Sequence, residues 1–230
     1  MCPNSAKPVV EGATNYARTS GGNAMQDRWD LVAKSRTDFA DVLDSLSDEQ
    51  LAATTLCKNW TPLDVAAHLV SFVELSLPQM MMSMAKGGFD VDKAWAANAD
   101  KYKAMGAPAI SKSLRANASK TAPIKSFSSG LTIVDVLVHT QDVRRPLGLD
   151  GELDSEALRY GLDWVTTHKQ RKMHVEPTDI EGLRLEATDL DWSWGDGALV
   201  SGTGEAILLG INRRDVGAEL TGDGVLKLSS

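Results

Sequence analysis

Two stretches of this sequence, TPLDVAAH (residues 61–68) and TIVDVLVH (residues 132–139), repeat the pattern Thr-x-x-Asp-Val-x-x-His. In each, the threonine stands where the N-cap hydroxyl of a helix would stand, and the aspartate three residues later can bond back to the amide of the cap. The histidine follows the aspartate by four residues, about one turn farther along the same face. The two stretches therefore predict two helix starts, each with a carboxylate next to an imidazole.

This pattern is compatible with two interpretations, and spacing alone favours the first. In the first, each aspartate only caps its helix and each histidine is an ordinary core or rim residue. In the second, the two faces meet inside a helical bundle, where His68, Asp135 and His139 supply three metal ligands and leave one position open for water or substrate. Asp64 is a fourth candidate. It is a weaker one, because a fourth protein ligand would close the open position, and its carboxylate can instead cap the helix or contact a metal ligand. Asp142, three residues after His139, either orients that histidine or a neighbouring arginine, or is merely solvated.

The composition indicates a globular protein that does not bind nucleic acid. The chain has 230 residues, of which 43% are hydrophobic, so it can bury a substantial core. Its formal charge is −7 and no basic run exceeds two residues, so it would repel a phosphate backbone. Its two cysteines, Cys2 and Cys57, exclude a disulfide framework and a cysteine-rich zinc site. No stretch approaches the roughly 18 apolar residues of a membrane span, and no signal peptide is evident. We therefore expect a cytoplasmic protein without a membrane partner.

The order of the elements predicts a mainly α protein in three parts. Residues 1–24 are rich in Pro, Gly, Ser, Asn and Thr and are expected to form a flexible tail. Residues 25–175 show helical periodicity, and residues 176–230 change to the alternation of a strand, which predicts a small α+β domain. The helical segments are expected at 29–46, 47–50, from 62 until Pro78 kinks or ends the helix, 92–105, 110–118, 132–145 and from a cap at Ser155. In the last part we expect a strand at 183–188 continuing through the tryptophans at 192 and 194, a turn at 195–197, a pairing segment at 198–200, a helix at 205–212 and a last strand at 225–228.

Other side chains are weaker candidates for a functional role. Four methionines within residues 80–84 fill an irregular core or, alternatively, line a pocket for apolar groups. His168 and His174 lack an acidic partner at helical spacing and are interpreted as structural. No Gly-x-Ser-x-Gly elbow occurs and Cys57 has no neighbouring base in the sequence, so a serine or cysteine nucleophile is not indicated.

Several motifs together resemble the mycothiol-dependent maleylpyruvate isomerase-like family, whose N-terminal part is a DinB-like four-helix bundle. The first motif is CKNWTPLDVAAHL (residues 57–69), and the second runs from Asp135 through His139 and Asp142 to PLG (residues 146–148). In the C-terminal part, ATDLDW (187–192), GDG (195–197), the pair of leucines at 208–209 that leads to Arg213, and LTG (220–222) resemble the small second domain of the family. The resemblance covers about residues 25–228. It implies a DinB-like bundle with a small C-terminal α+β domain.

The resemblance also implies a site. A divalent metal, usually zinc, would be bound by His68, Asp135 and His139, with Asp135 in place of the family's glutamate. Because aspartate is one methylene shorter, it would reach the metal directly or through water. The family's Gly-Arg-Pro motif, whose arginine is implicated in activity, would place Arg213 in the site, although its neighbours here are Asn212 and Arg214.

The function implied by the resemblance is that of a thiol-using enzyme. A low-molecular-weight thiol such as mycothiol would bind the open metal position as a thiolate and attack a small electrophilic substrate. An isomerase would then expel the thiol, whereas an S-transferase would leave it attached, and Arg213 would hold a carboxylate. The alternative from another class is a catalytically silent module that contains a metal or binds an apolar ligand. We expect a monomer or a homodimer in either case.

Overall fold

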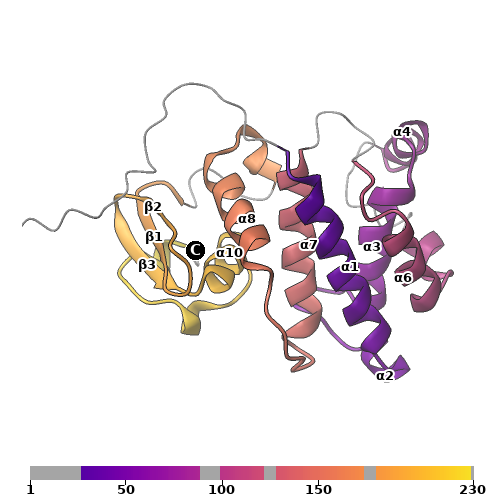
Figure 1. The fold of residues 1–230 in the computed structure, drawn as a ribbon, viewed down its shortest axis with the longest axis horizontal. Helices are drawn as coiled ribbons and strands as arrows, with labels where there is room; N and C mark the ends of the chain where they lie inside the picture. The colour runs from indigo at the N-terminus through magenta and orange to yellow at the C-terminus, as the bar shows by residue number, and fades with distance from the viewer. Residues whose placement is uncertain (1–26, 89–98, 122–127, 174–179, 229–230) are drawn as a thin grey trace, which may run out of the picture.

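The computed structural model describes residues 27–88, 99–121, 128–173 and 180–228. In this part of the chain, helices form a bundle that leads into a small sheet with its own helices (Figure 1). The elements are α1 (Trp29–Ser45), α2 (Asp48–Leu51), α3 (Pro62–Glu74), α4 (Leu77–Lys86), α6 (Ala107–Ala116), α7 (Ser129–Arg144), α8 (Ser155–Thr167), η1 (Lys169–Met173), β1 (Leu183–Ala187), β2 (Ser193–Gly195), β3 (Ala198–Gly202), α10 (Gly204–Ile211), η2 (Gly217–Glu219) and α11 (Val225–Leu228).

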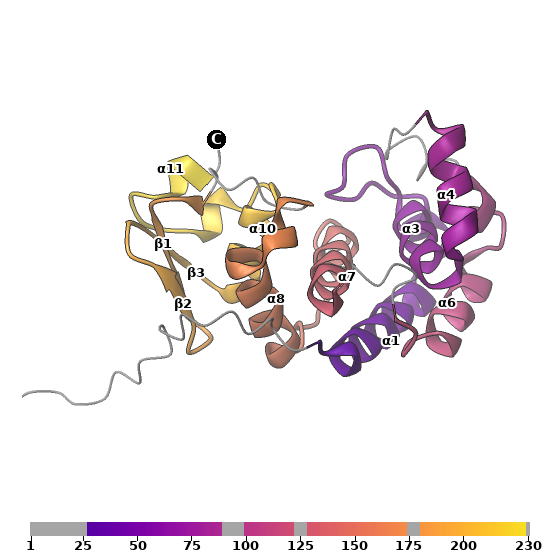
Figure 2. The same cartoon turned by 90° about the horizontal axis from the view of Figure 1, so that it is seen from above.

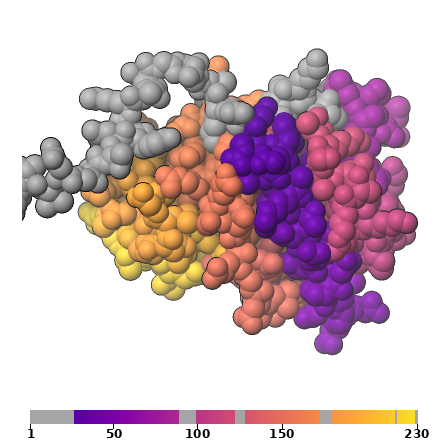
Figure 3. Space-filling view, in the orientation of Figure 1, coloured from indigo at the N-terminus to yellow at the C-terminus, as the bar shows by residue number. Residues whose placement is uncertain are grey.

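Helix α7 lies in the middle of the molecule. Seen from above, α1, α3 and α6 lie on one side of it, and α8, α10 and the sheet lie on the other (Figure 2). Two hydrophobic clusters use different faces of α7: Val136 and Val143 pack with α1, α3 and α6, whereas Leu131, Ile133 and Leu137 pack with α8, α10 and the sheet. The space-filling view shows α1 between the parts of the chain that contain α6 and α8 (Figure 3). The two Thr-x-x-Asp-Val-x-x-His stretches are called the first box (residues 61–68) and the second box (residues 132–139). Helix α7, which carries the second box, is thus buried on nearly all sides.

The strand predicted at residues 183–188 is confirmed as β1, but it does not continue through the tryptophans, because the chain bends after Ala187 and Trp194 lies in the separate strand β2. The sheet has the order β2-β1-β3, with β1 antiparallel to β2 and parallel to β3. Residues 198–200 pair, as expected, and their partner is β1, to which they run parallel. The turn before them needs glycine, because Gly195 has φ +77° and a Cβ there would lie 2.1 Å from the carbonyl oxygen of Leu183.

Three other expectations about the elements are wrong. Residues 225–228 form the short helix α11 and not a strand. The prediction failed because four residues are too few to distinguish a helical period from a strand period. Helix α8 is capped by Asp154, whose side chain accepts from the amide of Ala157, and not by Ser155. Helix α7 begins at Ser129 with Ser128 as its cap, three residues before the expected start at Thr132.

The structure also shows how the methionine segment begins. Helix α3 ends at Glu74, and α4 starts after Ser76 with Pro78 in its first turn, where the missing amide costs nothing. Met80 is buried, but Met81 and Met82 are 55% and 57% exposed, so only the first of these fills a core. Half of the helix expected at 92–105 lies outside the described residues, and residues 99–103 are helical.

Two expectations about domain organisation concern segments that the structure does not describe, namely the tail at residues 1–24 and the boundary near residue 175. One hydrophobic cluster contains residues from both sides of that boundary, from Leu31 in α1 to Leu228 in α11. No helix within the described ranges is long and apolar enough to cross a membrane.

Candidate metal centre

The first box is a capping box, as its sequence predicts. The amide of Thr61 donates to Asp64 Oδ2 at 2.9 Å, and the amide of Asp64 donates back to Thr61 Oγ1 at 3.2 Å. Asp64 also forms an ion pair with Lys103, with Nζ 2.5 Å from Oδ1. Burial alone would raise the pKa of Asp64, but the hydrogen bonds from Lys103 and Thr61 outweigh it and hold the pKa below its ordinary value. Asp64 is thus engaged in capping and in this ion pair.

The second box does not cap a helix, because α7 has already begun when the chain reaches it. Thr132 lies inside the helix, and its hydroxyl contacts the carbonyl oxygen of Ser128 at 3.5 Å. Asp135 is therefore in the second turn of α7, where no amide needs a cap. The expectation that Asp135 caps the start of its helix is wrong. The carboxylate of Asp135 instead lies next to α3.

Asp135 and the two histidines bring three possible ligand atoms together between α3 and α7. His68 Nε2 lies 3.5 Å from each oxygen of Asp135, and His139 Nε2 lies 3.6 Å from Oδ1. A tetrahedral zinc ion with bonds of about 2.0–2.2 Å holds its ligand atoms roughly 3.3–3.6 Å apart. The donor set of two imidazoles and one carboxylate, and its spacing, therefore fit a divalent metal with Asp135 as a direct ligand.

Asp142 determines which nitrogen of His139 faces this cluster. Its Oδ2 lies 2.8 Å from His139 Nδ1, and an ionised carboxylate can only accept, so Nδ1 carries the proton. The lone pair of His139 is then on Nε2, next to Asp135. This is the arrangement in which histidine ligands of metals are usually held. Of the possibilities that the sequence left open for Asp142, the structure shows contacts with both His139 and an arginine.

That arginine is Arg214. Its Nε donates to Asp142 Oδ1 at 2.9 Å and its NH2 group to Oδ2 at 2.6 Å, while the side chain of Asp142 is 0% exposed. Burial alone would raise the pKa of Asp142, but the hydrogen bonds from Arg214 and His139 hold it below its ordinary value. Asp142 is therefore a buried carboxylate that stays ionised near neutral pH.

The structure places Arg213 differently from its neighbour. Arg213 is exposed and adopts φ +62°, which turns the chain between Asn212 and Arg214. The buried side chain of Asn212 donates to the carbonyl oxygen of Leu208 and anchors this turn. Sequence reasoning missed Arg214, and the available signal was only that two adjacent arginines follow a buried helix.

Cys57 lies on the other side of His139. Its sulfur, a nitrogen of His139 and an oxygen of Asp142 lie within 4.8 Å of one another, which makes a second possible metal group. This group fits a metal less well, because Asp142 already accepts hydrogen bonds on both oxygens. Burial also raises the pKa of the Cys57 thiol to about 11, so the thiolate that a metal needs is disfavoured.

Aromatic rings form the walls of the cluster. The Trp60 ring stacks on His139 with centroids 5.7 Å apart and also lies 5.0 Å from the His68 ring. Phe72 meets His68 edge-on at 4.9 Å. Both imidazole side chains are about a tenth exposed. These contacts fix the planes of the two rings and limit the access of water to them.

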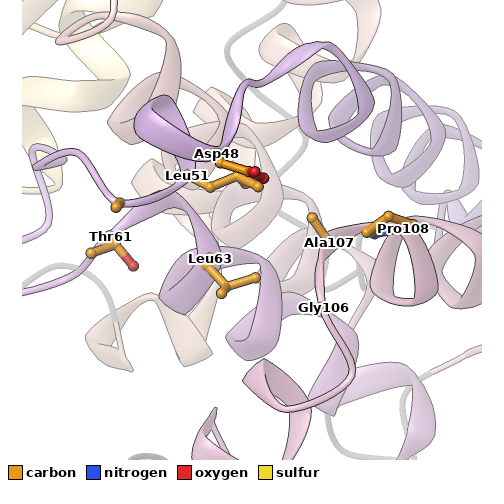
Figure 4. Close-up of a pocket in the computed structure, with 8 residues that line it drawn as sticks. Asp48, Leu51, Thr61, Leu63, Gly106, Ala107 and Pro108 are labelled. Carbon is orange, nitrogen blue, oxygen red and sulfur yellow. The ribbon is translucent and has the colours of Figure 1, made fainter.

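Two other features lie apart from this cluster. His168 stacks on Trp164 at 5.3 Å, and burial lowers its pKa, whereas His174 lies outside the described residues. An open groove of about 440 Å³ lies between α2 and the starts of α3 and α6 (Figure 4). It is lined mainly by apolar groups, with Asp48 as its charged residue, and the three ligand candidates are not part of its lining.

The fold and the donor cluster define a class: a helical bundle with a small α+β part and a candidate divalent-metal centre between two of its helices. Residues 32–144 match the family model described as the mycothiol maleylpyruvate isomerase N-terminal domain. This part of the chain is therefore similar to the N-terminal domain of that family, and the resemblance inferred from the motifs is confirmed.

Solved structures support the fold. The chain is similar to the crystal structure of a mycothiol-dependent maleylpyruvate isomerase, with a TM-score of 0.56, 14% sequence identity, and coverage of 85% of this chain and 91% of the other. A mutant of that enzyme matches equally well. The predicted DinB-like helical fold with a small C-terminal part is thereby confirmed. None of the curated proteins compared with this sequence matches it.

Proposed function

We propose that this protein is a divalent-metal-dependent enzyme that uses a low-molecular-weight thiol, mycothiol or a similar compound, either to isomerise a small electrophile or to transfer the thiol sulfur onto it. The observation that carries the proposal is the convergence of one carboxylate oxygen and two imidazole nitrogens from His68, Asp135 and His139. The family of the N-terminal domain and the fold of the isomerase structures support the same chemistry.

The residues of the chain would divide the work as follows. His68, Asp135 and His139 would hold the metal, zinc being the best match to this donor set. A bound divalent metal supplies Lewis acidity, which lowers the pKa of a thiol and favours its thiolate. Trp60 and Phe72 shield the histidines from water. Arg213, an exposed residue on the turn before Arg214, would bind a carboxylate of the substrate or of the thiol.

Both reactions need only the thiol and the electrophile as reactants. The thiolate sulfur forms a bond to an electrophilic carbon of a conjugated double bond, and the π electrons move onto the activating carbonyl. In an isomerase, the adduct rotates about the former double bond, the electrons return, and the thiolate leaves. In an S-transferase, a proton is taken up instead and the thioether remains.

Metal content and its response to thiol test this proposal. We expect about one zinc-like ion per chain in the purified protein and a negligible amount in His68→Ala, because that substitution removes one of three ligands. His168→Ala, which changes a histidine stacked on Trp164, is the matched control and should keep the metal. In a cobalt-substituted sample, addition of mycothiol should change the visible absorption of the ion.

Two results would contradict the proposal at different levels. Equal and negligible metal in the wild type and in His68→Ala would exclude the metal centre. A bound metal whose cobalt spectrum does not respond to any small thiol would favour the silent metal-containing or ligand-binding module.

The role proposed for Arg213 is tested separately. With maleylpyruvate and mycothiol as the assayed pair, Arg213→Gln should raise KM for the carboxylate-bearing reactant roughly 10- to 100-fold, because one charge-assisted hydrogen bond is lost. The kcat value and the metal content should stay near those of the wild type. Arg213→Lys keeps the charge and should recover part of the loss. An unchanged KM in Arg213→Gln would remove Arg213 from the site.

A further inference from the structure

We propose that Arg214 is a positioning residue of the metal centre: acting through Asp142, it holds His139 with Nδ1 protonated and Nε2 directed toward Asp135. The inference deepens the proposed function, since it gives Nε2 a purpose, but the contacts that carry it do not depend on a metal. It assigns to the C-terminal part of the chain a share in building a site whose ligand candidates all lie in the bundle.

The hydrogen bonds form a continuous series from Arg214 to His139. Arg214 contacts both oxygens of Asp142 in a forked arrangement, at 2.9 Å and 2.6 Å. Asp142 Oδ2 also lies 2.8 Å from His139 Nδ1. The remaining guanidinium nitrogen of Arg214 donates to the carbonyl oxygen of Asn212 at 2.8 Å, which fixes the guanidinium itself. Because both oxygens of Asp142 are engaged, this carboxylate cannot rotate away from the imidazole without breaking a bond.

Burial makes the arginine necessary. Asp142 is 0% exposed, and an ionised carboxylate in such surroundings requires a compensating charge or several donors. Arg214 supplies the charge and two of the donors. If Arg214 were replaced by a neutral side chain, the carboxylate would lose that compensation and its fixed orientation. The imidazole of His139 could then adopt either tautomer, and only one of them presents the Nε2 lone pair to Asp135.

The origin of the two partners in the chain adds a structural consequence. Asp142 lies on α7, whereas Arg214 follows α10 and is 72 positions away. The family match at residues 32–144 includes Asp142 and all three ligand candidates but not Arg214. The bundle would therefore contain the ligands, and the C-terminal part would determine how one of them is oriented.

A neighbouring arginine provides a matched control. Arg145 also joins α7 to the C-terminal part, because it forms ion pairs with Glu205 and Glu219 at 2.6 Å each. Arg145→Gln therefore weakens the attachment between the same two parts of the chain and leaves the contacts of Asp142 in place. An effect specific to Arg214→Gln cannot be explained by loosened attachment alone.

The test uses the full chain labelled with ¹⁵N-histidine, without metal and at a pH where the imidazoles are neutral. Long-range ¹H–¹⁵N correlations report the tautomer of each ring, and the signals of His139 are assigned by their loss in His139→Asn. We expect a single Nδ1-protonated tautomer for His139 in the wild type and in Arg145→Gln. We expect a mixture of tautomers in Arg214→Gln. Cobalt titration of the same proteins should show affinity reduced about 10- to 100-fold in Arg214→Gln and unchanged in Arg145→Gln.

Asp142→Asn provides a second variant if Arg214→Gln does not fold. Its amide can either accept from or donate to Nδ1, so it should also give mixed tautomers. A single Nδ1-protonated tautomer in either folded variant would overturn the proposal, and so would an equal change in Arg145→Gln. If the wild type binds no cobalt, the proposed function fails. The tautomers of His139 still decide whether Arg214 positions this histidine through Asp142.

Discussion

Asp135→Asn is expected to lower the affinity of the chain for a divalent metal by more than about 100-fold. Changing a residue that only supports a ligand typically costs 10- to 100-fold, and Asp135 would itself be a ligand and would supply the negative charge of the site. Its oxygens lie 3.5 and 3.6 Å from the two imidazole nitrogens, so the substitution changes the charge but hardly the shape. Cobalt titration and competition with a chelator would measure the loss.

The first box contains the matched control for this substitution. Asp64 occupies the same position in its motif as Asp135, but it caps α3 and pairs with Lys103. Asp64→Asn should keep the metal affinity and lower the free energy of unfolding by about 1 kcal/mol through the weakened cap. Equal metal affinity in Asp135→Asn and the wild type would mean that the carboxylate of the second box is not a ligand.

Trp164→Ala is expected to lower the free energy of unfolding by about 3–5 kcal/mol, the usual range for a fully buried tryptophan. Trp164 is 0% exposed and belongs to the hydrophobic cluster that joins α7, α8 and the sheet. A Cβ at Gly130 would lie 2.0 Å from its ring, so the indole rests directly on the backbone of α7. The truncation would open a cavity there. Urea unfolding followed by circular dichroism would measure the change.

The same ring also helps to start α7, and a second variant separates this role from packing. Trp164 Nε1 donates to Ser128 Oγ at 2.9 Å, and Ser128 caps the helix. Trp164→Phe keeps most of the buried ring but loses this hydrogen bond, so it should cost about 1–2 kcal/mol. A loss in Trp164→Ala no larger than that in Trp164→Phe would show that the site relaxes around the missing ring.

The two boxes show how far sequence reasoning reaches. The cap formed by the first box could be predicted, because the contacts of Thr61, Pro62 and Asp64 that start α3 are local to that helix. The ion pair of Asp64 with Lys103 could not be predicted in this way. Nor could the second box, because the cap of α7 is Ser128, whose hydroxyl accepts from Trp164, a residue that is distant in sequence and packs on Gly130. The grouping of His68 with Asp135 and His139 followed from the motif, since one contact between helices brings all three together.

The remaining differences have a common origin in contacts between distant segments. The turn at Asn212 decides that Arg214, and not Arg213, reaches Asp142, and a sequence with two adjacent arginines does not express this choice. The pairing of β3 with β1 likewise depends on the path of the chain after Gly195. Local patterns predicted the elements, whereas the partners of those elements depend on tertiary structure.

The position of α7 between two hydrophobic clusters limits how this site can change during evolution. A helix buried on nearly all sides has few positions where a new side chain can extend into solvent, and it carries Asp135, His139 and Asp142. New substrate preferences would arise more easily in the segments that approach α7 from either side: the loop with Cys57 and Trp60, and the turn with Arg213. Divergence within such a protein is therefore expected to preserve the centre and to vary what surrounds it.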